Sequence, residues 1–368
     1  MRKIPYVNVA AQFAEEREEL MARIEAVFAR GSFVGGPTVD RLEEELAAFH
    51  GVPADRVVAL NSGTDALILG MKALGLGPGD EVITPPNSFV ASTAAIVAVG
   101  ATPVFADVLD DQTLDPDAAA AAITPRTRAI MPVHLTGRVC AMDRLTALAG
   151  RHGLAIVEDA AQSIGSFHHG RISGTFGELG CFSLHPLKNL GAAGDAGFLL
   201  ARDAEVARRV RLWRSHGLAD RNTVTEWGTV SRLDSLQAEI LRFRLTRLPD
   251  VLARRRRNAA RYRELLADLP VFIPPERPDT VDTFHTFVVQ LDRRDALRDF
   301  LAARGVATAI HYPVPLHLQP AARSLGYGPG AFPVTERQAA RIVTLPVNQF
   351  LADDDLVHIA DLMGEFHR

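Results

Sequence analysis

One lysine stands out among the residues whose chemistry could serve catalysis. The chain has 40 lysine and arginine residues, of which only three are lysines, namely Lys3, Lys72 and Lys188. Arginine supplies positive charge wherever charge alone is needed, whereas only an amine that can lose its proton condenses with a carbonyl. Lys188 lies in FSLHPLKNLGAAGDAG, residues 182–197, between two apolar runs and just before a glycine-rich turn. A partly desolvated lysine in that place is the type of amine that forms a Schiff base.

A pair of acidic residues ends another apolar run. Residues 154–159 read LAIVED, so Glu158 and Asp159 close a segment typical of a buried strand. Successive side chains of a strand point to opposite faces, and therefore only one of the two carboxylates can face a site. Such a carboxylate could bind a metal ion or a ribose, or it could hold the proton of a pyridinium nitrogen.

A third segment has the residues of a phosphate site. NSGTDAL, residues 61–67, follows the apolar run 57–60. Glycine and small polar residues at a strand-to-helix junction expose N–H groups at the positive end of a helix, where phosphate binds. They are also ordinary helix caps, so this segment alone does not decide. A Walker A motif and an early G-x-G-x-x-G are both absent, which disfavours nucleotide hydrolysis and dinucleotide binding. The phosphate junction, the carboxylate and the lysine together describe a site for pyridoxal 5′-phosphate (PLP).

The elements that would position these residues alternate along the first 200 residues. Two helices are expected in the first 50 residues, over 12–30 and about 39–49. Short apolar runs then alternate, mostly, with helical stretches such as 66–74 and 141–152. We expect strands at 57–60, 81–84, 102–105, 129–133, 154–158, 181–184 and 197–200. This order predicts an α/β fold with a mostly parallel sheet, covered on both faces and carrying its site at the carboxyl ends of the strands.

After Trp213 the pattern changes, and a length of 368 residues suggests two domains. We expect an arginine-rich helical region over 234–269, interrupted at Pro249. A proline-rich break, a strand and a helix follow at 273–278, 286–291 and 294–304. We therefore predict a large domain, 1–245, and a smaller α+β domain, 246–368. The run of four arginines at 254–257 is interpreted as a solvated helix face, in preference to a phosphate-binding role.

The composition excludes several classes of protein. Apolar residues make up 47% and charged residues 23%, which disfavours disorder, collagen and coiled coil. The two cysteines, Cys140 and Cys181, are not in a paired spacing, which argues against a disulfide framework or a cysteine-rich zinc site and suits a reducing cytosol. A net charge of −4 disfavours nucleic-acid binding. Without a secretory leader or a run of about 18 apolar residues, we expect a cytoplasmic protein that binds neither membrane nor metal.

The motifs also resemble those of a known family. NSGTDAL, EDAAQSIGS (158–166) and the lysine segment, with PVHLTGR (132–138), SRLDSLQAE (231–239) and IHYPVPLHLQP (310–320), are similar to the DegT/DnrJ/EryC1/StrS family of PLP-dependent sugar aminotransferases. The match runs in order over nearly the whole chain. The resemblance implies fold type I, with an aspartate-aminotransferase-like large domain. It also implies a homodimer with both active sites at the subunit interface.

The resemblance assigns roles to the central residues. It implies that Lys188 forms the Schiff base and shuttles the proton, and that Asp159 pairs with the pyridine nitrogen. Gln162 matches a position near the 3′-oxygen of the cofactor, and Phe89, in NSFV (87–90), matches the aromatic residue that stacks on its ring.

Other positions match the family's phosphate site and its histidines. Gly63, Thr64 and Ser183 correspond to the residues that bind the phosphate. His134 and His185 match positions near the site, although a purely structural role accounts for each equally well.

The chain departs from the family at one position. Many relatives read N-S-R-L-D where this chain has VSRLD, residues 230–234, and their asparagine helps hold the phosphate of the partner subunit. Val230 cannot do so, and Arg232 is a candidate to supply the charge.

By resemblance, the reaction moves an amino group from L-glutamate to a keto sugar. The KNLGAAGDAG turn is similar to that of relatives acting at C3 of dTDP- or UDP-linked 3-keto hexoses, so we favour a nucleotide-linked 3-keto-6-deoxyhexose or a related 3-keto sugar. Two alternatives are C4 of a nucleotide-linked 4-keto hexose and, from HPLKNL, an octulosonate-type keto-deoxy sugar without a nucleotide. A PLP-dependent sugar dehydratase would have histidine in place of Lys188, and a non-catalytic PLP-binding regulator would need a DNA-binding arm for which the sequence has no spare segment.

Overall fold

The computed structural model describes residues 2–368 and is built around a seven-stranded sheet. Its strands, in spatial order, are β1 (Val57–Leu60), β9 (Gly197–Ala201), β8 (Leu179–Ser183), β5 (Ala155–Asp159), β4 (Thr127–Ile130), β2 (Glu81–Thr84) and β3 (Thr102–Phe105). Only β9 runs antiparallel to its neighbours, and the pairs from β8 to β3 are all parallel. Each predicted strand is present within a few residues of its expected bounds, and the mostly parallel α/β sheet is confirmed.

Helices cover both faces of this sheet. Along β1, Val58 and Leu60 belong to the core beneath α3 (Gly63–Ala73), α4 (Val90–Ala98) and α7 (Ala204–Trp213). The alternate residues, Val57 and Ala59, belong to the core beneath α2 (Pro37–His50) and α8 (Ser235–Leu265). A further core lies against α5 (Pro116–Ala121) and α6 (Met142–His152). Because both faces are buried, the central strands are mostly apolar rather than alternating.

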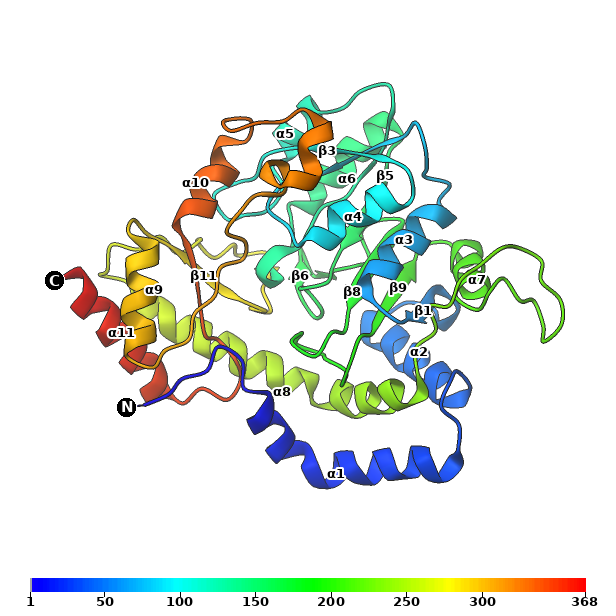
Figure 1. Ribbon diagram of the computed structural model, residues 1–368, viewed down its shortest axis with the longest axis horizontal. Coiled ribbons are helices and arrows are strands. Elements are labelled where there is room, and N and C mark those ends of the chain that lie inside the picture. Colours follow the sequence, from blue (N-terminus) through cyan, green and yellow to red (C-terminus); the bar gives the residue numbers. More distant parts are fainter. Residues whose placement is uncertain (1) are drawn as a thin grey trace.

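The N-terminal helix α1 (Val9–Arg30) packs outside this layered body. It lies beside α8, with Leu20 against Ile240 and Phe243 (Figure 1). The helix also exposes Phe13, Met21 and Phe28.

Helix α8 continues through Pro249, so the predicted interruption is wrong. A proline removes one N–H···O=C bond and crowds the preceding turn, at a cost of about 3 kcal/mol in a helix interior. The apolar face nevertheless continues on both sides of the proline, where Leu241, Leu245, Leu248 and Leu252 are all buried in one core. This tertiary packing offsets the local penalty, which the sequence pattern alone does not reveal.

The C-terminal part has a core of its own. Strands β11 (Phe287–Gln290) and β12 (Ile342–Leu345) pair antiparallel and share a core with α9 (Arg294–Ala303) and α11 (Asp353–His367). The second half of α8 supplies Ala259 and Tyr262 to this core, and Leu266 just after the helix and Ile4 of the N-terminal segment also enter it. We propose a division into residues 1–245 and 246–368, in which α8 is shared by both cores.

The remaining elements are short. They are α10 (Pro333–Arg341), the small sheet of β10 (Thr280–Val281), β6 (Phe167–His168) and β7 (Arg171–Ile172), and the 3₁₀ turns Ala54–Arg56, Leu135–Gly137, Leu316–Leu318 and Pro320–Leu325. Within residues 2–368, no helix is both long enough and apolar enough to cross a membrane.

Candidate active site

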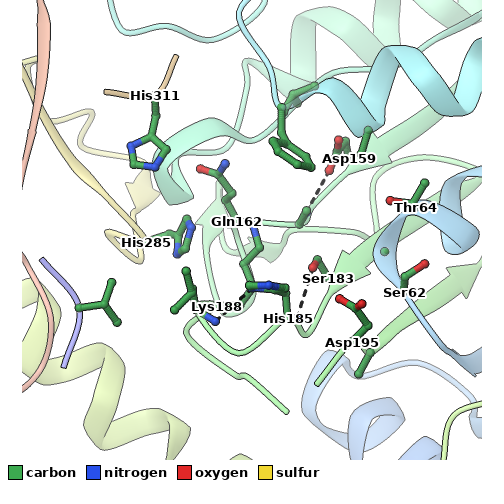
Figure 2. A pocket seen from close by; sticks show the side chains of 18 of the residues that line it. Ser62, Thr64, Asp159, Gln162, Ser183, His185, Lys188, Asp195, His285 and His311 are labelled. Carbon is green, nitrogen blue, oxygen red and sulfur yellow. Dashed lines mark hydrogen bonds between the residues drawn. The ribbon is translucent and has the colours of Figure 1, made fainter. Parts of the chain in front are cut away.

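A cavity of about 410 Å³ opens at the carboxyl ends of β5 and β8, and residues of the C-terminal part form its opposite wall. It brings together all seven of the predicted site residues, which are separated by up to 125 positions in the chain (Figure 2). They are Gly63, Thr64, Phe89, Asp159, Gln162, Ser183 and Lys188.

Lys188 lies in the turn that follows β8. Its backbone N–H donates to the carbonyl of His185 at 2.8 Å, and the side chain of the next residue, Asn189, holds the turn to the carbonyl of Thr283 at 3.2 Å. Burial lowers the pKa of the Lys188 amine from 10.5 to about 8, although the negative charge of Asp159 opposes that change. A substantial fraction of the amine is therefore neutral near physiological pH, as a nucleophile or a proton carrier requires.

Asp159 ends β5 and turns its carboxylate into the cavity. One oxygen accepts a hydrogen bond from the hydroxyl of Ser92 at 2.6 Å, and the other accepts from the N–H of Ala161 at 3.1 Å. Ser92 comes from α4 and is fully buried. Sequence reasoning missed Ser92, since a serine inside an apolar helix has no motif to mark it.

Glu158 points to the other face of the strand, as the alternation of side chains predicts. It is fully buried and accepts hydrogen bonds from the backbone N–H groups of Gly174, Phe176 and Gly177 at 2.6–2.8 Å. His134 Nε2 lies 3.0 Å from the same carboxylate. The backbone N–H of Cys140 lies 3.2 Å from His134 Nδ1, and the ring nitrogen Nε2 donates its proton to Glu158. His134 is thus a structural residue outside the cavity.

Gln162 lies on the floor of the cavity with its amide fixed on both sides. Its oxygen accepts from the backbone N–H of Thr136 at 2.8 Å, and its nitrogen lies 3.5 Å from the hydroxyl of Tyr312. Its orientation is therefore set before any ligand binds.

The first turn of α3 forms one end of the cavity, and His285 and His311 lie at the other end (Figure 2). Ser62 caps this helix by accepting from the N–H of Asp65 at 3.1 Å. Within the described chain, the N–H groups of Gly63 and Thr64 have no hydrogen-bond partner, and both residues line the cavity. A Cβ on Gly63 would lie 2.8 Å from Cβ of Ser183, so only glycine lets that serine approach the helix end.

These residues fit PLP. Two free N–H groups at a helix N-terminus and a nearby hydroxyl suit a phosphate. Asp159 is a buried carboxylate for the pyridine nitrogen, and Lys188 is an amine for the aldehyde. Phe89, at the mouth, leaves 54% of its surface exposed and lies 5.9 Å from the ring of Tyr312, so it offers an apolar face to a planar group.

Sequence reasoning missed the wall that the C-terminal part contributes. This wall consists of Arg255, His285, His311, Tyr312 and Asn348, together with Tyr6 of the N-terminal segment. Arg255 is only 5% exposed, and its guanidinium donates to the carbonyls of Phe284 and His285 at 3.1 and 3.2 Å. The interpretation of residues 254–257 as a solvated face is therefore wrong for Arg255. Four successive helix positions span a full turn, so one of them must face inward.

Val230 and Arg232 do not line the cavity. Val230 is half exposed and pairs with Ser215, whereas the intervening Ser231 is buried and donates its hydroxyl to Asn61 at 3.2 Å. Whether either residue reaches a phosphate in a second subunit stays a prediction.

The fold and the site together define a fold type I PLP-dependent transferase, in which a lysine, a strand-end carboxylate and a helix N-terminus surround one cavity. The chain belongs to the DegT/DnrJ/EryC1/StrS aminotransferase family, whose model matches residues 14–363. The predicted family and fold are thereby confirmed. The chain is a PLP-dependent aminotransferase, and structures of a relative from Streptococcus pneumoniae include its PLP and PMP forms.

The similarity to characterised relatives extends over whole chains. The dTDP-3-amino-3,4,6-trideoxy-alpha-D-glucose transaminase of Streptomyces venezuelae is 42% identical, and the match covers 99% of this chain and 96% of the relative. The UDP-N-acetyl-3-dehydro-alpha-D-glucosamine 3-aminotransferase of Acidithiobacillus ferrooxidans is also 42% identical, with 98% and 97% covered. Among solved structures, S. venezuelae DesV in complex with a ketimine intermediate superposes with a TM-score of 0.97, covering 100% of this chain and 99% of that one at 42% identity.

Proposed function

We propose that this enzyme transfers an amino group from L-glutamate to C3 of a nucleotide-linked 3-keto hexose. The observation that carries the proposal is the meeting of Lys188, Asp159 and the α3 N-terminus in one cavity. The choice of sugar is supported by two relatives at 42% identity, whose names describe 3-amino or 3-dehydro sugars linked to dTDP or UDP.

The residues of the chain divide the work of the reaction. PLP, when bound, would supply a ring that withdraws electrons from the bonds of the substrate carbon that carries the amino nitrogen. The N–H groups of Gly63 and Thr64, with the hydroxyl of Ser183, hold the phosphate. Asp159, oriented by Ser92 Oγ at 2.6 Å, holds the proton on the ring nitrogen.

Lys188 moves the proton. Its amine has a pKa of about 8, because burial makes the charged form unfavourable. A group whose pKa lies near the working pH can both take up and return a proton, which the transfer between two carbons requires.

The proposal includes a cytoplasmic homodimer with its sites at the interface. Several large apolar side chains are exposed near the cavity mouth and elsewhere on the surface, which is costly unless another surface covers them. They include Phe28, Phe89, Leu187 and Trp227.

The two cysteines support the cytoplasmic location. Cys140 and Cys181 are both unpaired and buried, which suits a reducing compartment.

A substrate panel tests the proposed reaction. The purified enzyme, supplied with L-glutamate, is offered dTDP- and UDP-linked 3-keto hexoses, a dTDP-linked 4-keto hexose and an octulosonate-type keto acid. We expect 2-oxoglutarate and an aminated product with a 3-keto sugar, detected by mass spectrometry. Lys188→Ala should abolish both products, whereas Lys72→Ala, which changes an exposed lysine of α3, should not. Turnover of only the 4-keto or the octulosonate substrate would contradict the proposed position of attack.

A further inference from the structure

The wall of the cavity formed by the C-terminal part contains a buried positive charge without an internal counter-ion. Arg255 is 5% exposed, and within the described residues its guanidinium donates hydrogen bonds to two backbone carbonyls. Its Nε has no partner within the described chain, and no carboxylate among residues 2–368 forms an ion pair with it. A buried charge is costly unless it is paired, so an uncompensated guanidinium facing a ligand cavity indicates an anionic ligand.

The groups around Arg255 do not neutralise it. Burial lowers the pKa of His285 well below its usual value, and the nearby charges of Lys188 and Arg255 lower it further. Burial lowers the pKa of His311 to about 4. Both imidazoles are therefore neutral near pH 7, and the Nδ1 of His285 has no hydrogen-bond partner within the described chain. The wall thus combines one fixed charge with neutral hydrogen-bonding groups.

The N-terminal segment completes this wall. Tyr6 stacks on His311 with 5.8 Å between ring centroids, and its phenol lies near enough to Arg255 for each to influence the other. The side chain of Asn348 holds the segment by donating to the carbonyls of Pro5 and Tyr6 at 3.4 and 3.3 Å. Figure 1 shows this segment beside the C-terminal elements. The segment around Tyr6 is therefore part of the cavity wall.

We propose that Arg255, with Tyr6 and His285 beside it, binds a carboxylate of the amino donor. This assignment rests on the proposed function and adds to it the residues that recognise the donor. A planar guanidinium pairs with a carboxylate through two parallel hydrogen bonds, and buried surroundings make such bonds strong.

The position of the wall favours a donor carboxylate over the two other anions of the reaction. The phosphate of the cofactor belongs at the α3 N-terminus, and Figure 2 shows Thr64 and Ser62 on the opposite side of Lys188 from His285 and His311. The diphosphate of a nucleotide sugar is separated from the reacting carbon by the sugar ring. The α-carboxylate of an amino acid is bonded to the reacting carbon itself, so it must bind near Lys188. The charges of Lys188 and Arg255 both lower the pKa of His285, which places this histidine near both residues.

Binding of glutarate to the PLP-loaded enzyme tests the assignment without turnover, because glutarate has both carboxylates of the donor but no amine. We expect Arg255→Met to weaken glutarate binding about tenfold to a hundredfold in isothermal titration, since a charge-assisted hydrogen-bond pair is lost. Arg257→Met is the matched control, because Arg257 is exposed on the same helix and lies outside the cavity. A folded Arg255→Met variant that binds glutarate as the wild type does would overturn the assignment.

The same titration with dTDP tests whether Arg255 binds the diphosphate of a nucleotide sugar instead of a donor carboxylate. We expect Arg255→Met to leave the dTDP affinity within about twofold, since the assignment gives Arg255 to the donor carboxylate and not to the diphosphate. Loss of dTDP binding in this variant, with or without loss of glutarate binding, would overturn the assignment to a donor carboxylate.

A crystal of the wild-type enzyme soaked in glutarate gives an answer even if Arg255→Met does not fold. A carboxylate within hydrogen-bond distance of Arg255 supports the assignment. A glutarate bound in the cavity away from Arg255 contradicts it. Neither result depends on transamination, so a failure here differs from a failure of the substrate panel.

Discussion

The lysine at the centre of the site acquires its reactivity from its surroundings. Burial lowers the pKa of Lys188 to about 8, and the negative charge of Asp159 limits the effect. Only the neutral amine attacks an aldehyde, so the rate at which the enzyme without cofactor takes up PLP should rise with pH and level off above about pH 8. The growth of the visible absorbance band, followed from about pH 6 to pH 10, measures this rate. A rate that continues to rise tenfold per unit up to about pH 10 would indicate an ordinary lysine.

Ser92 should matter although it has no proposed contact with a substrate. It donates to Asp159 at 2.6 Å, and a hydrogen bond to a charged group contributes about 1.5–3 kcal/mol. We expect Ser92→Ala to lower kcat about tenfold with little change in KM for glutamate, as steady-state kinetics would measure. Ser163→Ala removes another buried serine hydroxyl, bonded to a backbone carbonyl outside the cavity, and should leave kcat unchanged. Wild-type kcat in the Ser92→Ala variant would show that Asp159 needs no such support.

Single residues also show where sequence reasoning fails. Asp159 could be located because it ends an apolar strand, and Lys188 because it lies in the turn after one, since ligands gather at that edge of a parallel sheet. Arg255 was missed because the expected break at Pro249 separated it from Leu245 and Leu248, whose helical spacing places position 255 on the buried face. Tyr6 and Asn348 are 342 positions apart and meet only through tertiary packing, so no local pattern predicts them.

At the scale of elements, the close approach of α3 to β8 depends on the absence of a side chain at Gly63. A Cβ on Gly63 would lie 2.8 Å from Cβ and 2.9 Å from Cα of Ser183. We expect Gly63→Ala to weaken PLP binding at least tenfold and to reduce stability by about 1–3 kcal/mol, because the backbone must shift to relieve the overlap. Equilibrium dialysis and denaturant unfolding measure the two effects.

The control for that change is Gly150→Ala in α6, where an added Cβ would meet no atom within 4 Å. Alanine is favoured over glycine in a helix, so this variant should be as stable as the wild type or slightly more stable. Equal PLP affinity in the Gly63→Ala variant and the wild type would contradict the proposed phosphate site.

The strands of the seven-stranded sheet were largely predictable, whereas β12 and α11 of the C-terminal part were not among the predicted elements. The strands are short apolar runs bounded by turns, and their burial on both faces leaves that pattern intact. The continuation of α8 through Pro249 was not predictable, because the local rule is correct and is overcome only by the packing of Leu245, Leu248 and Leu252 in the core.

At the scale of the whole molecule, we expect a second copy of the chain to complete the assembly. The chain has a mass of 39.9 kDa, and Trp227 leaves 88% of its surface exposed within one subunit. Sedimentation equilibrium should give about twice the mass of one chain, since large exposed apolar side chains favour association. A species with the mass of one chain at micromolar concentration would contradict the homodimer.

The most direct test of the account is the visible absorption spectrum of the purified enzyme before and after addition of L-glutamate. We predict that the wild type and Lys72→Ala show the absorbance of PLP bound to the lysine, and that glutamate converts it to that of the pyridoxamine form. Lys188→Ala should lack the initial band. A wild-type spectrum without a PLP band after reconstitution, or an unchanged band in Lys188→Ala, would contradict the central role of this lysine.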